Sequence, residues 1–282
     1  MSAAKAKRWL ARRATAGRSA GKRGADGGVD EPRAAPECPD GWRTGPPDFV
    51  GVGVQRAGTS RWFSLIAAHP EIASANSMKE LHYFDRFHSG GCGPAELAAY
   101  ERYFPRPQGQ KAGEWTPLYA SAPWIPPLLA AAAPHARLLM LVRDPVERWR
   151  SGMALDAAVA ARRGAPLSRY APLEAFVRGL YHAQLSVLLK HFERSQVLLL
   201  QYERCNAAPA AELERTYAFL GLSDTRFGPD LEAHPRQQPH KPWLDERART
   251  AYIEAYGADV LALAEGFPEL DLGLWPNFAG LL

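Results

Sequence analysis

The sequence predicts a single α/β domain in which a central parallel sheet is covered by helices on both faces. Apolar runs alternate with helix-periodic stretches from Pro46 onward, and such alternation implies right-handed crossovers between parallel strands. The run at residues 138–142 is apolar throughout, which is typical of a strand buried on both faces. With 282 residues, 46% of them hydrophobic, the chain can bury a full core as one domain.

The expected elements follow one another along the chain without an internal repeat. The predicted strands are residues 49–54, 72–75, 138–142 and 197–201. The predicted helices are residues 60–68, 94–103, 146–163, 173–194, 210–220 and 245–264. Residues 120–134 are rich in Pro and Ala but have an apolar face, which predicts a packed helix flanked by turns.

Residues 1–45 are predicted to be a disordered basic extension, and residues 46–282 to be the folded domain. The extension has few large apolar side chains beyond Trp9 and Leu10, so it cannot bury enough surface to fold alone. Its first forty residues hold nine Lys and Arg against five Asp and Glu, which is the whole formal excess of +4. We therefore interpret the tail as a solvated extension rather than a nucleic-acid-binding or lipid-binding arm.

Targeting signals and cysteines bear on the cellular compartment. No apolar stretch reaches membrane-spanning length, and the start lacks a hydrophobic signal region. Cys38, Cys92 and Cys205 are widely separated and form no metal-ligand pattern. These features predict a cytoplasmic enzyme of bacterial type with free thiols and no membrane span.

A basic loop lies between the first predicted strand and the first predicted helix. Free N–H groups and the positive dipole end at a helix start bind anions. In residues 54–62, Gly58 lets the backbone approach an anion closely, Thr59 and Ser60 add hydroxyl donors, and Arg56 adds a cation. No Lys stands just ahead of the hydroxyls, so the loop is not a Walker A motif. The pattern predicts a phosphate site of another kind.

A second anion site is predicted after residues 138–142. Arg143 falls at the carboxyl end of this strand, where ligands bind in open α/β sheets, and Pro145 suits the first turn of a helix. Ser151 follows about two helical turns later. Arg143 and Ser151 are therefore expected to converge on one further anion.

Together the two loops resemble the sulfotransferases that use 3′-phosphoadenosine 5′-phosphosulfate (PAPS). The resemblance runs from about residue 47 to the C-terminus and includes four further segments. These are Lys-Glu-Leu-His-Tyr-Phe-Asp at 79–85, Gly-Glu-Trp-Thr-Pro-Leu-Tyr at 113–119, Gln-Tyr-Glu at 201–203 and Leu-Gly-Leu-Trp-Pro at 272–276. The first of them is similar to the K-E-x-H-[FY]-F-D segment of the heparan sulfate branch. The resemblance implies a P-loop-like sheet, PAPS as the donor, and a small-molecule or glycan acceptor.

The resemblance also implies roles for particular residues. Glu80 is the expected general base, with His82 as the alternative, and partial burial is expected to raise the pKa of Glu80. Arg56 is expected to neutralise charge on the leaving 5′-phosphate. The expected donor-binding residues are Arg56, Ala57, Gly58, Thr59, Ser60, Arg61, Arg143, Ser151 and Lys241. Within this set the first loop would hold the 5′-phosphosulfate, and Arg143 and Ser151 the 3′-phosphate. No metal ligand is expected.

The sequence departs from the family pattern at two positions. Arg56 replaces the usual Lys of the first loop, and Trp115 replaces the Lys expected after Glu114. A Trp face at that place would suit a sugar ring, an aromatic or an apolar acceptor. Arg148 and Arg150 are expected on a solvated helix face, with Arg148 supporting the nucleotide site.

Two other functions remain open from the residues alone. A P-loop nucleotide kinase would share the sheet and the anion cradle, but it needs the Walker A lysine and a metal-holding Asp. A catalytically inactive nucleotide-binding scaffold would keep the fold and lose turnover. The acceptor also stays open between a sugar hydroxyl, a natural-product phenol and a lipid hydroxyl, because acceptor specificity resides in surface loops such as residues 89–94.

Overall fold

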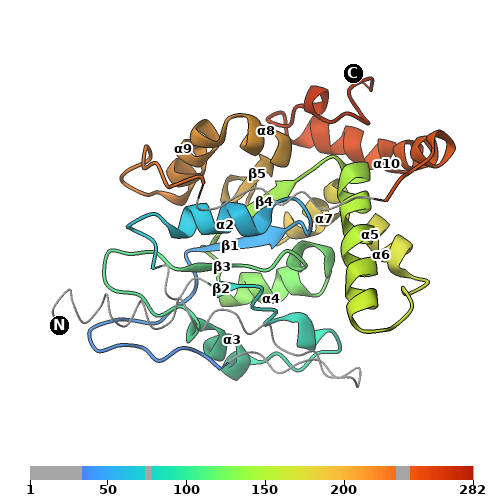
Figure 1. Ribbon diagram of the computed structural model, residues 1–282. Helices are drawn as coiled ribbons and strands as arrows, with labels where there is room; N and C mark the ends of the chain where they lie inside the picture. Colours follow the sequence, from blue (N-terminus) through green and yellow to red (C-terminus); the bar gives the residue numbers. More distant parts are fainter. Residues whose placement is uncertain (1–33, 74–77, 233–241, 282) are drawn as a thin grey trace.

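The computed structural model describes residues 34–73, 78–232 and 242–281 (Figure 1). Five strands form one sheet in the order β2-β3-β1-β4-β5, and all neighbours are parallel. The strands are β1 (Phe49–Gly53), β2 (Met78–Lys79), β3 (Gly113–Trp115), β4 (Arg137–Val142) and β5 (Val197–Gln201). The predicted α/β fold with a parallel sheet is confirmed.

Helices cover both faces of the sheet. In Figure 1, α2 and α9 lie on one side of the strands and α4 on the other. The helices are α2 (Thr59–Ala67), α3 (Pro94–Glu101), α4 (Ile125–Ala132), α5 (Pro145–Arg162), α6 (Ala171–Val177), α7 (Tyr181–Leu188), α8 (Tyr202–Ala207), α9 (Pro209–Leu220) and α10 (Glu246–Gly266). Short 3-10 turns are η2 (Asp85–Phe87), η3 (Tyr119–Ser121), η4 (Arg194–Gln196) and η5 (Leu272–Leu274).

Strand β1 is the centre of the core, because all five of its residues are buried. It pairs with β3 on one side and β4 on the other. A Cβ on Gly51 would lie 2.0 Å from Cδ2 of Trp115. The indole can therefore pack against the strand only because residue 51 has no side chain. The indole Nε1 donates to the Gly53 carbonyl (3.1 Å). These contacts fix β3 beside β1.

The second strand differs from the prediction. Within the predicted residues 72–75, Ile72 forms only an isolated bridge with Lys111, and residues 74–75 lie outside the described residues. The strand that pairs with β3 is β2, a few residues later. Strand β3 itself was not predicted, because three residues that include a buried Glu114 carry no apolar run.

The predicted helix over residues 173–194 is wrong as a single element. It is divided into α6 and α7 by a turn at Gly179. A Cβ at Gly179 would lie 2.7 Å from the Tyr256 hydroxyl, which donates to the Phe176 carbonyl at the end of α6 (3.0 Å). Packing against α10 therefore requires the chain to turn here. The short helix α8 was also missed, whereas α2, α5, α9 and α10 agree with the predicted ranges within a few residues.

The N-terminal boundary involves residues that contact the domain. Residues 1–33 lie outside the described part of the chain. Arg43 forms an antiparallel bridge with Arg106, and the Arg106 guanidinium pairs with Asp48 (Nε to Oδ2, 3.0 Å). The division at residues 45 and 46 stays a prediction.

Candidate active site

The loop between β1 and α2 is shaped by a glycine at the helix start. Gly58 is the N-cap residue with φ of 86°, and a Cβ there would lie 2.9 Å from the ring of Tyr202. Both the backbone angle and the space therefore require glycine. No side chain caps α2. The start of α2 is therefore a place where an anion can bind, and its role in holding the 5′-phosphosulfate stays a prediction.

Arg56 is held in this loop by a hydroxyl on its side chain and by a second arginine on its backbone. Its Nε donates to the Ser151 hydroxyl of α5 (3.0 Å), and its carbonyl accepts from Nη1 of Arg143 (3.2 Å). Burial and the nearby charge of Arg143 lower the pKa of Arg56 from its ordinary value. The structure brings together Arg56, Arg143 and Ser151, which the sequence had placed in two separate loops. The charge of Asp156 acts on Arg56 in the opposite direction. Among the described residues no carboxylate is hydrogen-bonded to either guanidinium, and two such neighbouring groups favour an anionic ligand.

Arg143 also presents an unsatisfied donor. Its guanidinium lies over the Tyr202 ring, 4.6 Å from the centroid. Its buried Nε has no hydrogen-bond partner. Buried donors of this kind normally find a partner, and Ser151 is close because it binds the adjacent Arg56. Arg56 thus contacts both residues, and the expectation that Arg143 and Ser151 hold one anion together stays a prediction.

The other predicted donor-binding residues are spread over the start of α2. Ala57 and Thr59 are buried, whereas Ser60 is exposed and its carbonyl accepts from Ser64 (2.9 Å). Arg61 is near enough to α8 for its charge to lower the pKa of the Cys205 thiol, which burial raises. Lys241 lies outside the described residues.

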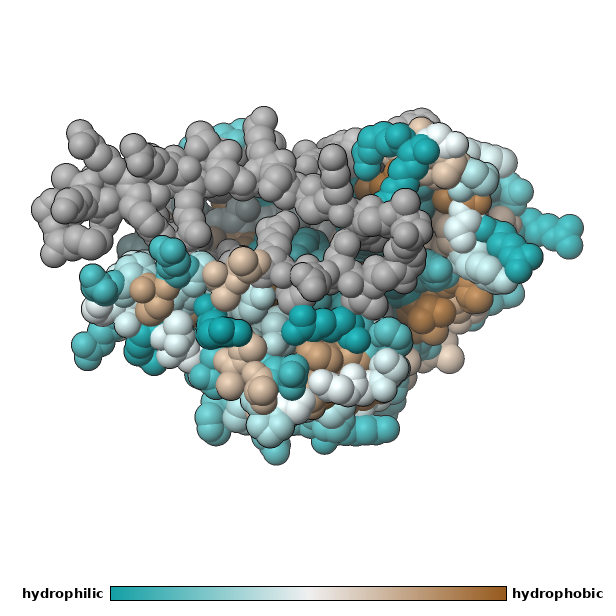
Figure 2. Space-filling model, turned by 90° about the horizontal axis from the view of Figure 1, so that it is seen from below, coloured by the Kyte–Doolittle hydropathy of each residue, from teal (hydrophilic) through white to brown (hydrophobic). Residues whose placement is uncertain are grey.

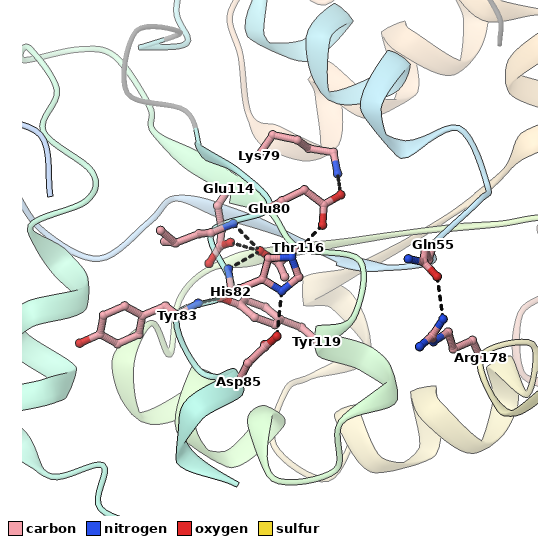
Figure 3. Close-up of polar contacts among 11 residues, drawn as sticks. Gln55, Lys79, Glu80, His82, Tyr83, Asp85, Glu114, Thr116, Tyr119 and Arg178 are labelled. Carbon is pink, nitrogen blue, oxygen red and sulfur yellow. Dashed lines mark hydrogen bonds and ion pairs between the residues drawn. The ribbon is translucent and has the colours of Figure 1, made fainter. Parts of the chain in front are cut away.

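A chain of four charged side chains follows β2 (Figure 3). Lys79 Nζ pairs with Glu80 Oε1 (2.5 Å), and the other Glu80 oxygen contacts His82 Nε2 (3.1 Å). His82 Nδ1 contacts Asp85 Oδ2 (2.8 Å). Asp85 was not predicted, although its i, i+3 spacing from His82 could have indicated the pair. Glu80 and His82 both have left-handed backbones, with φ of 57° and 55°.

The contacts within this group of four side chains give Glu80 and His82 different protonation states. Burial disfavours the imidazolium of His82, but hydrogen bonds to Asp85 and Glu80 outweigh it and raise the pKa to about 9. Burial alone would raise the pKa of Glu80, but the His82 hydrogen bond and the Lys79 charge hold it below its ordinary value. The predicted upward shift for Glu80 is therefore wrong. Near neutral pH, Glu80 can accept a proton and His82 cannot.

Trp115 does not serve as an acceptor platform. Its side chain is completely buried against β1, and its Nε1 is bonded to the Gly53 carbonyl. The expectation of an exposed indole face is wrong, because Gly51 leaves room for the ring inside the sheet. The Trp115 indole instead contacts the end of β1, where the loop with Arg56 begins.

A link between α6 and the β1 loop was not predicted. Arg178, at the end of α6, donates from Nη1 to Oε1 of Gln55 (2.9 Å) and pairs with Glu174 (3.4 Å). Gln55 directly precedes Arg56. Figure 3 shows this pair apart from the group formed by Glu80 and His82. The long separation along the chain left no local signal for the contact.

An apolar strip lies on α6 and on the turn before it. It consists of the exposed side chains of Leu173 and Val177 in α6 and of Leu167 and Tyr170, which precede the helix. In Figure 2, hydrophobic residues are seen in several places on the face viewed from below, including its right side. An exposed apolar strip of this kind marks a surface that can bind an apolar group.

The motifs near residues 143, 203 and 275 meet at the start of α5. Asp144 caps α5 by accepting from the N–H groups of its first turn (3.0 and 3.1 Å), and it also binds the Asn277 amide. Glu203 accepts from the Asp144 N–H (3.1 Å) and from Trp275 Nε1 (3.0 Å). Burial raises the pKa of Glu203 to about 7. The Gln-Tyr-Glu and Leu-Gly-Leu-Trp-Pro segments therefore hold the strand end that carries Arg143.

Arg148 lies inside the protein rather than on a solvated face. Its side chain is fully buried and donates to the Ala175 carbonyl of α6. The prediction of a solvated position is wrong because α6 packs over this part of α5. Arg150 pairs with Glu147 (2.8 Å) and donates to the Pro242 carbonyl (3.0 Å).

No helix in the described part of the chain is long and apolar enough to cross a membrane. Within the same residues, no group of three or more His, Cys, Asp or Glu side chains is arranged to hold a metal ion. Cys38, Cys92 and Cys205 are free.

Comparisons with known proteins give one consistent family. A family model described as "Sulfotransferase family" matches residues 94–226. Human heparan sulfate glucosamine 3-O-sulfotransferase 6 is 33% identical over 188 residues, covering 62% of this chain and 52% of that protein. Human heparan sulfate glucosamine 3-O-sulfotransferase 3B1 is 30% identical over 228 residues, covering 72% and 56%. The chain spans about half the length of these curated relatives.

Solved structures show a similar fold. A crystal structure of a sulfotransferase from Alicyclobacillus acidocaldarius superposes with a TM-score of 0.64 and 22% identity, covering 81% of this chain and 98% of that chain. The sulfotransferase domain of the Synechococcus PCC 7002 olefin synthase gives a TM-score of 0.52 at 16% identity, covering 83% and 98%. The single α/β domain is shared with these proteins.

Proposed function

Because the chain belongs to the sulfotransferase family, we propose that it transfers a sulfuryl group from PAPS to an acceptor hydroxyl. The observation that carries this proposal is the pairing of two sites at one edge of the sheet. Arg56 and Arg143 lie close together with no carboxylate of the described residues hydrogen-bonded to either, and Glu80 is held ionised beside the His82 imidazolium. In a parallel sheet the carboxyl ends of the strands share one edge.

The donor site fits the two anionic ends of PAPS. The uncapped start of α2 and Arg56 would hold the 5′-phosphosulfate, since Gly58 leaves the backbone accessible. Arg143 and Ser151 would hold the 3′-phosphate, which supplies a partner for the unsatisfied Arg143 Nε. When bound, PAPS supplies the sulfuryl group and a phosphate leaving group.

Glu80 is the proposed catalytic base. It would take the proton of the acceptor hydroxyl as the acceptor oxygen forms its bond to sulfur and the bond from sulfur to the 5′-phosphate oxygen breaks. Arg56 would neutralise charge on the departing phosphate. His82 cannot accept the proton because it is already an imidazolium, so we propose that it orients Glu80. The described residues offer no carboxylate cluster for a metal ion, and we propose transfer without one.

The proposed acceptor is a sugar hydroxyl. The relatives are named for transfer to glucosamine residues of heparan sulfate, and the side chain of Glu80 is 42% exposed, so an acceptor hydroxyl can reach it. A second candidate is an amphipathic alcohol, which the apolar strip on α6 favours. The cytoplasmic location and the bacterial origin stay predictions.

Formation of 3′-phosphoadenosine 5′-phosphate from PAPS tests the proposal directly. The purified chain would be incubated with PAPS and either heparan-type oligosaccharides, simple sugars or amphipathic alcohols, with and without EDTA. We expect product with at least one acceptor and no effect of EDTA, and Glu80→Gln serves as the inactive control. Tight binding of the desulfated nucleotide without any turnover would instead support a scaffold, and Mg²⁺-dependent ATP hydrolysis would support a kinase.

A further inference from the structure

The loop that carries Glu80 and His82 is bound along its whole backbone by one neighbouring segment. Residues 80–83 direct four consecutive N–H groups at the segment that begins with β3. The first donates to the Trp115 carbonyl (2.9 Å), the next two to the Thr116 hydroxyl (3.0 and 3.3 Å), and the last to the Tyr119 hydroxyl (2.9 Å). Figure 3 shows Thr116 at the centre of these contacts.

This support matters because the loop has an unfavourable backbone. Glu80 and His82 both occupy the left-handed region, which side chains other than glycine rarely adopt. Two such residues within three persist only where the surroundings hold them in place. The hydrogen bonds that the loop N–H groups donate to Thr116 and Tyr119 supply that constraint. They set the direction in which the Glu80 carboxylate and the His82 ring emerge.

The Thr116 hydroxyl can bind two N–H groups only if its own proton is directed elsewhere. A hydroxyl has one donor and two acceptor sites. Both acceptor sites face the loop, and the proton is donated to Oε2 of Glu114 (2.6 Å). Glu114 is completely buried, and its other oxygen accepts from the Tyr100 hydroxyl (2.5 Å). Glu114 therefore fixes the orientation of the Thr116 hydroxyl.

We propose that Thr116, oriented by Glu114, is a positioning residue for the transfer reaction. It acts through the loop of residues 80–83 and places the Glu80 carboxylate against the His82 imidazolium. This inference rests on the proposed function, but its structural part concerns only the loop. Thr116 touches neither reacting group with its side chain; it touches the backbone that carries them.

Thr116→Val tests the proposal because valine keeps the shape and removes both acceptor sites. We expect kcat to fall about 10- to 100-fold, since small displacements of a catalytic group cost that much. Affinity for 3′-phosphoadenosine 5′-phosphate, measured by calorimetry, should stay within about twofold, because the donor site is built from other residues. Thr116→Ser should recover kcat to within about threefold of wild type, since serine keeps the hydroxyl.

Thr216→Val is the matched control for lost stability. Thr216 is also fully buried, accepts from Trp62 Nε1 (3.3 Å) and donates to the Glu212 carbonyl (2.6 Å). It makes no contact with the loop. The two valine variants should lose similar thermal stability, but only Thr116→Val should lose kcat. An equal loss of kcat in both variants would overturn the proposal.

Two further measurements separate positioning from general damage. In a Glu80→Gln background, Thr116→Val should cause almost no additional loss, because it acts through Glu80. A full additional loss there would contradict the proposal. The His82 ring, followed by NMR, should titrate near 9 in the wild type and shift toward its ordinary range in Thr116→Val. The groups that face it are Asp85 on η2, Glu80 on its own loop, and buried Glu114 on β3.

The titration needs no turnover, so the two proposals can fail separately. If the wild type transfers no sulfuryl group to any acceptor, the proposed function fails, and the His82 titration still decides whether Thr116 holds the loop. If turnover is found and the His82 titration is the same in Thr116→Val as in the wild type, the positioning role of Thr116 is wrong.

Discussion

Two glutamates support the two halves of the site in different ways. Burial raises the pKa of both Glu114 and Glu203 to about 7. Glu114 is bonded to hydroxyl groups alone, from Tyr100, Thr116 and Tyr119, below the acceptor-side loop. Glu203 is bonded to two N–H groups, from the Asp144 backbone and the Trp275 indole, behind the donor-side strand end.

The two glutamates differ in how protonation of the carboxyl group affects their hydrogen bonds. A hydroxyl can reverse its role and accept a hydrogen bond, whereas an N–H group can only donate. A protonated Glu114 can donate to the Tyr100 oxygen and keep its hydroxyl contacts. In a protonated Glu203 one oxygen carries the proton and becomes a weaker acceptor, so one N–H contact is weakened. The acceptor-side support is therefore adaptable, and the donor-side support requires two acceptor oxygens.

The largest expected effect separates the base from the donor site. Glu80→Gln keeps the size of the side chain but cannot take the acceptor proton, so turnover should fall by roughly 10²–10⁴-fold. Affinity for 3′-phosphoadenosine 5′-phosphate should stay within a few-fold in calorimetry. If instead Glu80→Gln is active on a confirmed acceptor and His82→Ala is not, the base is His82.

The next effect concerns the donor half alone. Arg143→Ala should weaken binding of 3′-phosphoadenosine 5′-phosphate by about 2–4 kcal/mol, the scale of a lost charge-assisted contact. Adenosine 5′-phosphosulfate lacks the 3′-phosphate, so its affinity should hardly change. Calorimetry with both ligands measures the contrast, and equal losses would show that Arg143 does not read the 3′-phosphate.

The pH dependence of stability should reveal the buried carboxyl groups. A carboxyl whose pKa is higher in the folded state takes up protons on folding, so stability is greatest below about 4.5 and falls as pH rises toward 7. Each unit of pKa shift corresponds to about 1.4 kcal/mol, so Glu114 contributes a loss of about 3 kcal/mol at most. The pKa of His82 is higher in the folded state than its ordinary value. Its contribution to stability is therefore present below pH 6.5 and is lost as the pH rises from about 6.5 to 9.

Urea unfolding between pH 5 and 8 checks this dependence. Glu114→Gln removes one titrating group, so its stability should fall less over this range than that of the wild type. Glu80 has the opposite sign, because its lowered pKa adds stability above about 4.5. It has already reached its full effect by pH 5 and does not disturb the comparison. Parallel pH profiles for the two proteins would contradict an ionisable Glu114 near neutrality.

The sequence predicted the parts of the site that depend on neighbours along the chain. Arg56 and Gly58 lie between an apolar run and a helical pattern, and Arg143 ends another apolar run. The sequence could not predict that Trp115 is buried, because the space for it comes from Gly51 on another strand. The same holds for Thr116, whose two acceptor contacts join segments 34 and 35 residues apart.

The predicted direction of the Glu80 pKa shift was wrong for a related reason. Burial was expected to dominate, but the partners that oppose it are Lys79 and His82, whose side chains meet Glu80 only because its backbone is left-handed. Local sequence gives the residue types and not this geometry. Motif residues were therefore predicted better than the charges they carry.

The smallest expected effect is the sharpest test of the two supports. At pH 8, where both carboxyl groups are ionised, Glu114→Gln can keep its contacts with Thr116 and Tyr100: its amide oxygen accepts from Thr116 and its NH₂ donates to the Tyr100 oxygen. Glu203→Gln cannot, because its NH₂ would face an N–H donor. We expect Glu203→Gln to weaken 3′-phosphoadenosine 5′-phosphate by about 3- to 10-fold, equivalent to one hydrogen bond of roughly 1 kcal/mol. Glu114→Gln should leave this affinity within about twofold.

The measurement is calorimetry with both variants. If it shows the same affinity for both, the N–H contacts of Glu203 do not hold the strand end that carries Arg143. The contrast between hydroxyl and N–H partners then has no functional meaning.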